Sequence, residues 1–361
     1  MGTMHVASVV EQCWHKVPGG TARATVSTLD AMTRLNLGRF TGIAARHRTA
    51  PQLATPQIPI VYSRLPRPAL YESWHRLGRP RVESMIEDRI DVVHATGGAV
   101  PATHRPLVVT VHDLAFLDDP DDFTARGRNF MSRAWNEALA RADRIVCPTE
   151  HVADRCEAEG AQRWRLVVVP WGVTANDDIE PYIDRNGPYV LHVGTLEPRK
   201  NLSRLLDAMC DVDPALSLIS VGPPGWTADV GTQVARLGDR CRLMGRVDDS
   251  TRDALYRGAA LMCYPSTREG FGLPVLEAMA HGCPVVTSRG TATEEVGGDA
   301  VELIDPYSVA SITAGIERVW RDAGYRSEII ERGIKRASTF TWERTATELS
   351  AVYRDVSDSQ R

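Results

Sequence analysis

The sequence has no long hydrophobic run and no recognisable leader. Its apolar stretches are too short to cross a bilayer, and MGTMHVASVVEQCWHK contains neither a basic start with an apolar core nor a small-residue cleavage site. We therefore expect a cytoplasmic protein.

Charge of one sign is not in large excess either. The formal net charge is -4, so nucleic acid is not an expected partner and any anion should bind locally.

Paired cysteines are absent as well. The seven cysteines are scattered, odd in number and form no C-x-x-C pair. This pattern disfavours a disulfide framework and a structural zinc site, and it predicts reduced thiols in the core. The composition itself, 43% hydrophobic and 24% charged, is ordinary for a globular protein and excludes a disordered or fibrous chain.

The length of 361 residues favours two domains of about 170 residues each. In the first half, short runs such as DVVHA and PLVVTVH alternate with helical stretches, and the alternation restarts with PYVLHVG and LSLISVG. Buried Val and Ile runs separated by helices predict parallel, doubly wound sheets. Ligands of such sheets bind beyond the carboxyl ends of the strands, so the chemistry is expected in those loops.

The domain boundaries follow from composition. A polar segment breaks both periodicities, and we predict a linker over 176–188 between a first domain, 1–175, and a second, 189–340. The last stretch, 341–361, predicts an amphipathic helix that packs back on the first domain. The expected fold class is therefore α/β, with two Rossmann-like domains.

The segment PSTREGFGLPVLEAMAHGCP carries the most specific pattern. Pro274 suits the first turn of a helix, and Gly282 suits its end. Before the helix, Gly270-Phe271-Gly272 predicts a tight turn whose backbone N–H groups can approach a ligand closely. Together with the positive end of the helix, this turn predicts an anion site.

Two carboxylates bracket this turn. Glu269 precedes it, and Glu277 is expected in the first turn of the helix and exposed. Carboxylates so placed can accept hydrogen bonds from sugar hydroxyls, but the helix dipole alone would also explain Glu277. Local features leave both interpretations open.

The second pattern is the loop GTLEPRKN, which ends at Asn201, the expected cap of the next helix. Arg199 and Lys200 then lie beside the positive end of that helix, which disfavours cations unless an anion is bound. A solvated basic pair is the alternative. Because this loop leaves the same sheet edge as the GFG turn, both can converge on one diphosphate.

These segments resemble the GT-B glycosyltransferases of the large retaining group called family 4. Glu269 and Glu277 match its E-x7-E motif in EGFGLPVLEAMAHGCPVV, and GTLEPRKN matches its phosphate loop in a form similar to an O-antigen mannosyltransferase-like subgroup. The resemblance runs through nearly the whole chain, including VTVHDL, VVPWGV, VGPPGW and TFTWE. It implies two Rossmann-like domains that face a central cleft.

The resemblance also implies roles for individual residues. Glu277 would bind the ribose, Glu269 would contact donor-sugar hydroxyls as a catalytic residue, and Arg199 and Lys200 would neutralise the departing diphosphate. Thr195 stands where many members carry an arginine. The expected donor-binding set is Gly19, Gly20, Gly194, Thr195, Arg199, Lys200, Gly270, Phe271, Gly272, Leu273 and Glu277.

His112 follows the strand PLVVTV, and its match to the family's HD position implies a catalytic role near the donor sugar and the reacting centre. Asp113 would fix the imidazole tautomer. On local features alone, His112 is also explained as a structural residue at a strand end. Gly19 and Gly20 would let the backbone approach the diphosphate or the acceptor, or would simply form a flexible turn.

Acidic pairs such as Asp118-Asp119 and Asp248-Asp249 raise the question of a metal, since a hard cation needs converging oxygen ligands. Consecutive carboxylates on surface loops are usually solvated, and the resemblance implies Arg, Lys and helix amides in place of a metal. We therefore expect no metal and no cofactor besides the nucleotide-diphosphate sugar.

The expected activity is that of a retaining hexosyltransferase, with mannose from GDP-mannose favoured. Preorganised positive charge would stabilise the leaving diphosphate, and the family's front-face reaction retains the anomeric configuration. The alternatives are a UDP-sugar donor, a sugar-nucleotide epimerase, a glycosidase and a non-catalytic nucleotide-sugar-binding subunit. The expected acceptor is a lipid-linked or cell-envelope glycan.

One further segment, RLPRPALYESWHRLGRPR, gathers arginines around Leu70, Tyr71 and Trp74. A basic segment with aromatic residues can bind an anionic membrane surface, which would bring the enzyme to a membrane-proximal acceptor. The competing interpretation is a solvated helix whose Tyr71 and Trp74 pack inward. The arginines are Arg64, Arg67, Arg76, Arg79 and Arg81.

Overall fold

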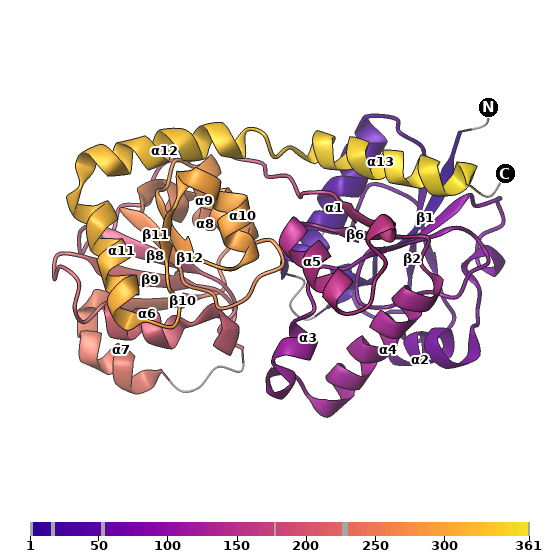
Figure 1. Ribbon diagram of the computed structural model, residues 1–361, viewed down its shortest axis with the longest axis horizontal. Coiled ribbons are helices and arrows are strands. Elements are labelled where there is room, and N and C mark those ends of the chain that lie inside the picture. The colour runs from indigo at the N-terminus through magenta and orange to yellow at the C-terminus, as the bar shows by residue number, and fades with distance from the viewer. Residues whose placement is uncertain (1–2, 16–18, 52–54, 177, 226–229, 360–361) are drawn as a thin grey trace. The chain divides into compact units, whose positions relative to one another are not determined.

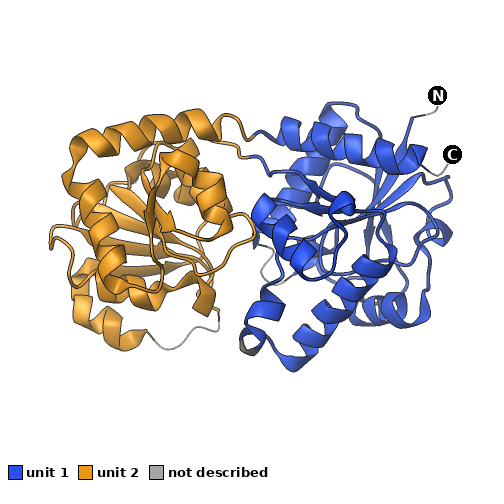
Figure 2. Ribbon diagram, in the orientation of Figure 1, with its two compact units in different colours: residues 1–172, 341–361 blue, residues 173–340 orange. Residues whose placement is uncertain are grey.

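The computed structural model describes residues 3–15, 19–51, 55–176, 178–225 and 230–359. The chain divides into two compact units, coloured separately in Figure 2. Unit 1 comprises residues 1–172 and 341–361, and unit 2 comprises residues 173–340. Each unit is a parallel sheet covered by helices (Figure 1). The expected α/β class with two Rossmann-like domains is confirmed.

The strands of unit 1 lie in the order β3-β2-β1-β4-β5-β6-β7. They are β1 (His5–Val9), β2 (Arg39–Ala44), β3 (Ile60–Tyr62), β4 (Val92–Ala95), β5 (Leu107–Thr110), β6 (Arg144–Cys147) and β7 (Leu166–Val168). The helices are α1 (Gly19–Arg34), α2 (Arg67–Leu77), α3 (Ala115–Asp118), α4 (Ala125–Arg141), α5 (Glu150–Ala158) and α13 (Trp342–Asp358). Because β1 pairs in parallel with both β2 and β4, the strand order reverses there, at the position where such sheets bind ligands.

The sheet of unit 1 is buried on both faces. Along β1, Ala7 and Val9 belong to one apolar cluster, whereas Val6 and the following Val10 belong to another. Successive side chains of a strand point to opposite faces, so a strand covered on both sides needs a continuous apolar run. This requirement is why the Val-rich runs of the sequence predicted the strands.

The C-terminal helix α13 packs on α1 within unit 1. Thr341 caps it by accepting a hydrogen bond from the Arg344 N–H, and its apolar stripe, which includes Leu349 and Tyr353, is buried in the cluster that contains Val6. The Thr345 hydroxyl donates to the Pro170 carbonyl at 2.7 Å. Each fully buried large apolar side chain contributes roughly 1.5–3 kcal/mol, so this stripe accounts for the docking of α13.

The strands of unit 2 lie in the order β10-β9-β8-β11-β12-β13. They are β8 (Tyr189–Val193), β9 (Ser217–Val221), β10 (Cys241–Gly245), β11 (Leu261–Tyr264), β12 (Val285–Ser288) and β13 (Glu302–Ile304). The helices are α6 (Leu202–Ala208), α7 (Gly231–Leu237), α8 (Asp249–Gly258), α9 (Leu273–Ala280), α10 (Ala292–Gly297), α11 (Val309–Arg321) and α12 (Ala323–Ala337). The order reverses between β8 and β11, so the loops after these two strands lie at the ligand-binding position of this sheet.

The segment expected as a linker, 176–188, lies within unit 2. The Tyr182 N–H donates to the Ala254 carbonyl at 2.9 Å. Asp184 is buried and forms an ion pair with Arg242 at 2.7 Å. These contacts fasten the second half of the polar segment to unit 2, and residue 177 lies outside the described residues. The polar residues at this position therefore include a buried carboxylate that forms an ion pair within unit 2.

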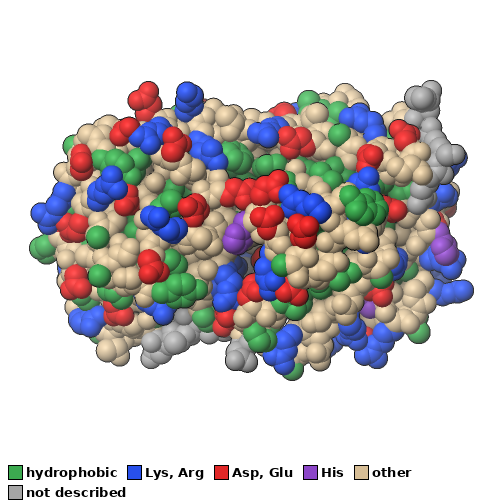
Figure 3. All heavy atoms as spheres, in the orientation of Figure 1, with side chains coloured by type: hydrophobic (Ala, Val, Ile, Leu, Met, Phe, Trp, Pro, Cys, Tyr) green, Lys and Arg blue, Asp and Glu red, His purple; other side chains and the backbone are tan. Residues whose placement is uncertain are grey.

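Within the described ranges, no helix is both long and apolar enough to cross a bilayer. On the face shown in Figure 3, Lys and Arg side chains are interspersed with Asp and Glu side chains. That face therefore carries no extended surface of a single charge.

Candidate active site

Lys200 and Glu269 form the centre of the candidate site in unit 2. Lys200 ends the short 3-10 helix η5 (Pro198–Lys200) in the loop after β8, and Glu269 follows β11. The Lys200 Nζ atom lies 2.5 Å from Glu269 Oε1 and 2.5 Å from the Tyr264 hydroxyl. Tyr264 in turn donates to Glu269 Oε1 at 2.8 Å. Two motifs far apart in the sequence thus meet in one hydrogen-bonded group.

Arg199 joins the same group. Its Nη1 atom lies 3.2 Å from Glu269 Oε2, and its Nε atom lies 2.8 Å from Glu197 Oε2. The Arg199 carbonyl accepts the Thr267 N–H at 2.8 Å, which ties the two loops together through the backbone. The solvated basic pair considered from the sequence is therefore wrong, because Lys200 is only 8% exposed and both cations contact carboxylates.

The charges in this group perturb one another. Burial opposes ionisation of Glu269, but Lys200 and Arg199 outweigh it and lower the pKa of the Glu269 carboxyl to about 2. Burial, followed by the neighbouring Arg199, lowers the pKa of Lys200, while Glu269 acts in the opposite direction. With Glu197 included, the ion pairs join two cations to two carboxylates. An incoming anion must therefore compete with Glu269 and Glu197 for Arg199 and Lys200.

The turn before α9 has the geometry that the glycines predicted. Gly272 has a φ of 88°, in the left-handed region, and a Cβ atom there would lie 2.5 Å from Thr293 Cγ2. Phe271 is buried and its ring meets Phe340 edge-on, with centroids 6.1 Å apart, so its side chain anchors the turn. Pro274 lies at the start of α9, as expected. The positive N-terminal end of α9 therefore lies directly after Gly272, at Leu273.

Glu277 differs from expectation in two respects. It is the fifth residue of α9, which begins at Leu273, so it lies in the second turn. It is also buried, with 8% exposure. Its Oε2 atom accepts a hydrogen bond from the Tyr256 hydroxyl at 3.0 Å and lies 3.9 Å from Arg252 Nε. The helix dipole acts mainly within the first turn, so it does not explain this carboxylate.

Asn201 occupies the N-cap position of α6 but does not cap the helix with its side chain. Its φ of 59° is left-handed, and its amide donates to the carbonyls of Pro265 at 3.0 Å and Pro306 at 2.6 Å. The expected capping role is therefore wrong. Asn201 holds the loops after β8, β11 and β13 together at the carboxyl edge of the sheet.

The loop after β9 packs against the loop GTLEPRKN, which is the candidate phosphate loop. Gly222 and Gly225 belong to the VGPPGW motif, and a Cβ atom on either would overlap a backbone carbonyl, that of Gly194 or of Leu196. The Leu196 N–H donates to the Pro223 carbonyl at 3.2 Å. The two glycines thus allow the loop that contains Gly194 and Thr195 to pack directly on the loop after β9.

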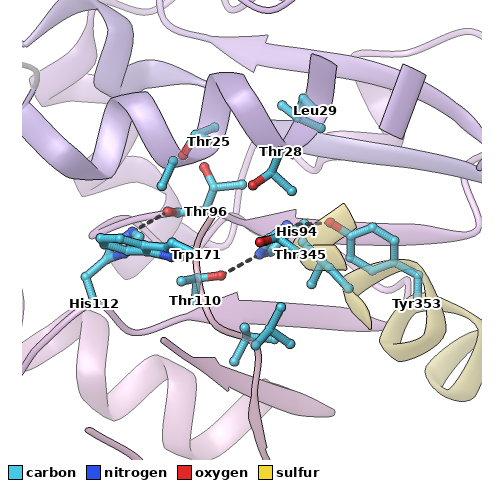
Figure 4. Close-up of a pocket in the computed structure, with 14 residues that line it drawn as sticks. Thr25, Thr28, Leu29, His94, Thr96, Thr110, His112, Trp171, Thr345 and Tyr353 are labelled. Atoms are coloured by element: carbon cyan, nitrogen blue, oxygen red, sulfur yellow. Dashed lines mark hydrogen bonds between the residues drawn. The ribbon is translucent and has the colours of Figure 1, made fainter. Parts of the chain in front are cut away.

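In unit 1, His112 follows β5 and lies next to Trp171, with ring centroids 5.2 Å apart (Figure 4). Its Nε2 atom donates to the Thr96 carbonyl at 2.7 Å, which fixes the Nε2–H tautomer and leaves Nδ1 as the acceptor. Asp113 instead accepts the Ala115 N–H, so its expected role in fixing the tautomer is wrong. Burial lowers the pKa of His112, although the Thr96 bond and Asp113 oppose this.

A small cavity of about 40 Å³ adjoins His112 between the sheet, α1 and α13. In Figure 4, His94 lies between Thr110 and Tyr353, which it contacts at 2.8 and 2.7 Å. Burial and the nearby His112 lower the pKa of His94 to about 3, so this imidazole is neutral. The chain of contacts from Tyr353 to Thr110 links α13 to the strand that precedes His112.

The expected site residues divide between the units. Gly19 and Gly20 open α1, and together with His112 they belong to unit 1. The remaining expected residues all belong to unit 2, where Arg199, Lys200 and Glu269 are in direct contact.

The acidic pairs have partners of their own. Asp118 forms an ion pair with Arg155 at 2.7 Å, Asp248 caps α8 through the Thr251 N–H, and Asp249 pairs with Arg252 at 2.8 Å. Within the part of the chain that the structure describes, no three His, Cys, Asp or Glu side chains are grouped to hold a metal. Metal independence remains a prediction.

The sequence motifs do not include Tyr264 and Tyr256, whose hydroxyls hold Glu269 and Glu277. Both tyrosines are fully buried, one at the end of β11 and one on α8. A buried tyrosine hydroxyl usually has a hydrogen-bond partner, so each was a signal that a polar group lies nearby. Only the fold shows that the partner is a motif carboxylate.

Comparisons with known proteins identify the family of the chain. Residues 175–336 match the family model Glycosyl transferases group 1, and residues 18–177 match Glycosyltransferase Family 4. The chain is 30% identical over 314 residues to an O-antigen chain mannosyltransferase B of Escherichia coli, an alignment that covers 80% of this chain and 81% of that protein. It is 32% identical over 270 residues to an MMP alpha-(1->4)-mannosyltransferase of Mycolicibacterium hassiacum, with 69% and 65% covered.

Among solved structures, a sucrose-phosphate synthase from Thermosynechococcus elongatus matches with a TM-score of 0.79. The match covers 99% of this chain and 100% of that chain at 18% identity, so it bears on the fold alone. The two family models together extend over both units, and the Escherichia coli relative aligns with most of the chain. The chain therefore belongs to the group 1 and family 4 glycosyltransferases and is a glycosyltransferase with the GT-B fold.

Proposed function

We propose that the protein is a retaining mannosyltransferase that uses GDP-mannose and acts on a lipid-linked or cell-envelope glycan. The observation that carries the proposal is the convergence of Arg199, Lys200 and Glu269 at the carboxyl edge of unit 2. The choice of mannose is supported by the two mannosyltransferases named above, which share about a third of their aligned residues with this chain. The acceptor class follows the name of the Escherichia coli protein.

In this proposal, Arg199 and Lys200 give up part of their ion pairing with the carboxylates. They form ion pairs with the diphosphate instead, as negative charge develops on the leaving group. Glu269, released from part of its ion pairing, accepts hydrogen bonds from donor-sugar hydroxyls. Such preorganised charge is the largest single contribution in many enzymes, because it needs no reorganisation during the reaction. These cations supply the charge that a metal would otherwise provide, so we propose a metal-independent reaction.

Glu277 and His112 take the remaining roles. Glu277 is held by Tyr256 and presents its carboxylate to the ribose hydroxyls. His112, neutral near pH 7 because of its burial, offers an Nδ1 acceptor to the donor sugar near the reacting centre. Gly19 and Gly20 allow the backbone of α1 to approach the diphosphate or the acceptor.

A peripheral contact with an anionic membrane is also proposed, but on electrostatic grounds alone. Trp74 is buried and donates its Nε1–H to the Pro80 carbonyl at 2.9 Å, and Tyr71 stacks on Phe130 with centroids 5.3 Å apart. The aromatic residues of this segment therefore pack inward and are not available to a lipid surface. The exposed arginines are Arg64, Arg76, Arg79 and Arg81.

Thermal unfolding across a panel of nucleotides tests the proposed donor. A ligand at 100 times its dissociation constant stabilises the folded state by about 2.7 kcal/mol, which raises Tm by several degrees. We expect GDP-mannose and GDP to stabilise the protein, with and without EDTA, and UDP-glucose to have a much smaller effect. Stabilisation by UDP-glucose alone would contradict the GDP-mannose assignment, and loss of the effect in EDTA would contradict metal independence.

The matched variants are Glu277→Ala and Glu331→Ala, the second an exposed glutamate on α12 of the same unit. We expect Glu277→Ala to abolish most of the stabilisation by GDP-mannose and Glu331→Ala to keep it. If Glu277→Ala lowers Tm as a core mutation does while the ligand-induced shift persists, Glu277 is a structural residue.

A further inference from the structure

A closed network of polar and aromatic side chains includes the carboxylate of Glu277 in unit 2. Its members come from two helices that lie side by side, α8 and α9 (Figure 1). Arg252 and Tyr256 on α8 are four residues apart, as are Glu277 and His281 at the end of α9, so each pair lies on one face of its helix. We call this group the Glu277 network. Its members are Arg252, Asp253, Tyr256, Glu277 and His281.

The first half of the Glu277 network runs through Arg252. Its Nε and Nη2 atoms donate to Asp253 Oδ1 at 3.1 and 2.7 Å, whereas Nε lies 3.9 Å from Glu277 Oε2. Burial alone would lower the pKa of Arg252, but Glu277 and Asp253 raise it above its ordinary value, so the guanidinium stays charged. Without the charge of Asp253, Arg252 would turn to Glu277, because a buried cation without a partner is strongly unfavourable.

The second half of the network runs through Tyr256. Its hydroxyl donates to Glu277 Oε2 at 3.0 Å. Burial, followed by the charge of Glu277, raises the pKa of Tyr256 well above its ordinary value, so the hydroxyl keeps its proton. The His281 ring stacks on the Tyr256 ring, with centroids 5.6 Å and planes 19° apart. His281 Nδ1 donates to the Glu277 carbonyl at 2.8 Å, which fixes the imidazole against the residue that Tyr256 holds.

His281 and Asp253 close the network. The His281 Nε2 atom is buried, has no hydrogen-bond partner among the described residues, and lies 3.9 Å from Asp253 Oδ2. Apolar side chains of similar size would fill this space without the cost of burying a carboxylate and an imidazole. Connected buried polar groups restrict one another's orientation. The effect of this pair on Glu277 therefore explains its presence better than packing does.

We propose that Asp253 and His281 are positioning residues for nucleotide binding, which act on the ribose through the carboxylate of Glu277. This rests on the proposed function, which assigns Glu277 to the ribose hydroxyls. Asp253 keeps Arg252 from donating a direct hydrogen bond to Glu277 that would compete with the ribose. His281 keeps the Tyr256 ring in the orientation from which its hydroxyl reaches Glu277.

The ratio of the affinities for GDP and 2′,3′-dideoxy-GDP measures this positioning, because the two ligands differ only in the ribose hydroxyls. Isothermal titration into wild type should give a ratio of roughly tenfold or more. We expect about threefold or less in Asp253→Asn and in His281→Leu, and a larger ratio in His281→Phe than in His281→Leu, because the phenyl ring still packs on Tyr256. The matched control is Asp207→Asn, since Asp207 near the end of α6 pairs with Arg236 at 2.6 Å.

Two further titrations make the comparison independent of the base and of folding. UDP and 2′,3′-dideoxy-UDP are titrated in parallel, so the ratio is measured whichever base the protein prefers. Pyrophosphate contains no ribose, and its affinity should be the same in wild type and in every variant that folds. Thermal midpoints identify any variant that does not.

A wild-type ratio in Asp253→Asn and in both His281 variants would overturn the proposal. Equal weakening of GDP, dideoxy-GDP and pyrophosphate would also overturn it, because a purely structural role has that result. Glu277→Ala separates this failure from failure of the proposed function. If Glu277→Ala removes the preference for GDP and the other variants keep it, Glu277 binds the ribose but Asp253 and His281 do not position it. If Glu277→Ala itself keeps the preference, the ribose assignment fails and the positioning role fails with it.

Discussion

Lys200 is a buried cation whose contacts suit two different states of the site. Its ammonium group touches Glu269 and the Tyr264 hydroxyl within a group that also contains Arg199. Burying an ammonium group costs several kcal/mol unless hydrogen bonds and opposite charges compensate. Here Glu269 compensates it, and a diphosphate would do so in its place. Such an exchange would distinguish a phosphate site from a structural ion pair.

Replacing Lys200 by Ala should therefore weaken the binding of GDP by at least about tenfold, equivalent to about 1.4 kcal/mol, and should change the binding of guanosine much less. Lys335→Ala is the control, since Lys335 is an exposed lysine on α12 of the same unit. Isothermal titration of both ligands into both variants measures the difference. Equal losses for GDP and guanosine would remove Lys200 from the phosphate site.

Glu269 should also make the free energy of unfolding depend on pH in the acidic range. Its folded-state pKa of about 2 lies below the ordinary 4.5, so its contribution is fully present above about pH 5 and is lost as pH falls towards 2. The difference corresponds to a stabilisation on the order of 3 kcal/mol. We expect the gap in unfolding free energy between wild type and Glu269→Gln to be constant from pH 7 to 5 and to narrow below pH 4.5. A gap unchanged down to pH 3 would show that the carboxylate is not held ionised by Lys200 and Arg199.

At the scale of single residues, the sequence predicted which residue types gather at the site, but not which of them contact one another. Glu269, Arg199 and Lys200 were recognisable from their motifs, whereas their direct contact depends on β8 and β11 being neighbours in the sheet. The absence of a side-chain cap at Asn201 was not predictable, because its left-handed backbone is imposed by bonds to Pro265 and Pro306.

At the scale of elements, α9 shows how a glycine determines where a helix starts. The motif predicted a short helix with Pro274 near its start, and α9 spans Leu273–Ala280. The helix begins at Leu273, one residue before Pro274, so Glu277 is its fifth residue, lies in the second turn and contacts Tyr256 on α8. Propensity alone predicts the existence of such an element better than its boundaries, since the boundary here lies at the left-handed backbone of Gly272.

Substituting Gly272 tests this account with a control inside the same unit. Gly290 has a similar left-handed φ of 73°, but a Cβ atom there would meet nothing within 4 Å. Gly290→Ala should cost about 1–2 kcal/mol of unfolding free energy from backbone strain alone. Gly272→Ala should cost a further 1–3 kcal/mol or so, because its Cβ atom crowds Thr293. Urea denaturation measures both, and equal losses would show that the Thr293 contact does not matter.

The polar segment 176–188 shows the limit of composition at this scale. It was predicted as a linker because it breaks both periodicities, yet Asp184 and Tyr182 attach it to unit 2. A buried ion pair requires polar residues in the sequence just as a solvated loop does. Composition alone does not distinguish a buried ion pair from a solvated loop, because the distinction depends on the position of Arg242.

At the scale of the whole molecule, the chain returns to its first unit at the end. Helix α13 packs on α1, so unit 1 is assembled from both ends of the sequence. The TFTWE start of this helix and its amphipathic pattern predicted that return, since an apolar stripe must be buried against another element. The identity of the acceptor was not predictable at this scale.

The membrane proposal is tested by co-sedimentation with phosphatidylserine vesicles at low and physiological salt. We expect salt-sensitive binding by wild type and loss of binding when Arg64, Arg76, Arg79 and Arg81 are all replaced by Gln, since each nearby cation contributes about 1 kcal/mol. Vesicles of neutral lipid are the control. If wild type and the variant bind anionic vesicles equally weakly, the surface does not dock on membranes and a soluble acceptor is favoured.

The central claim is sugar transfer from a nucleotide donor, and its most direct test follows radiolabelled GDP-mannose over time with and without a cell-envelope extract. We predict that the extract makes wild type release GDP and attach label to a larger product, and that Glu277→Ala does neither at a comparable rate. Conversion of the donor without any acceptor into an isomeric sugar nucleotide would identify an epimerase. Binding without release of GDP under either condition would identify a non-catalytic subunit, and either result would contradict the account.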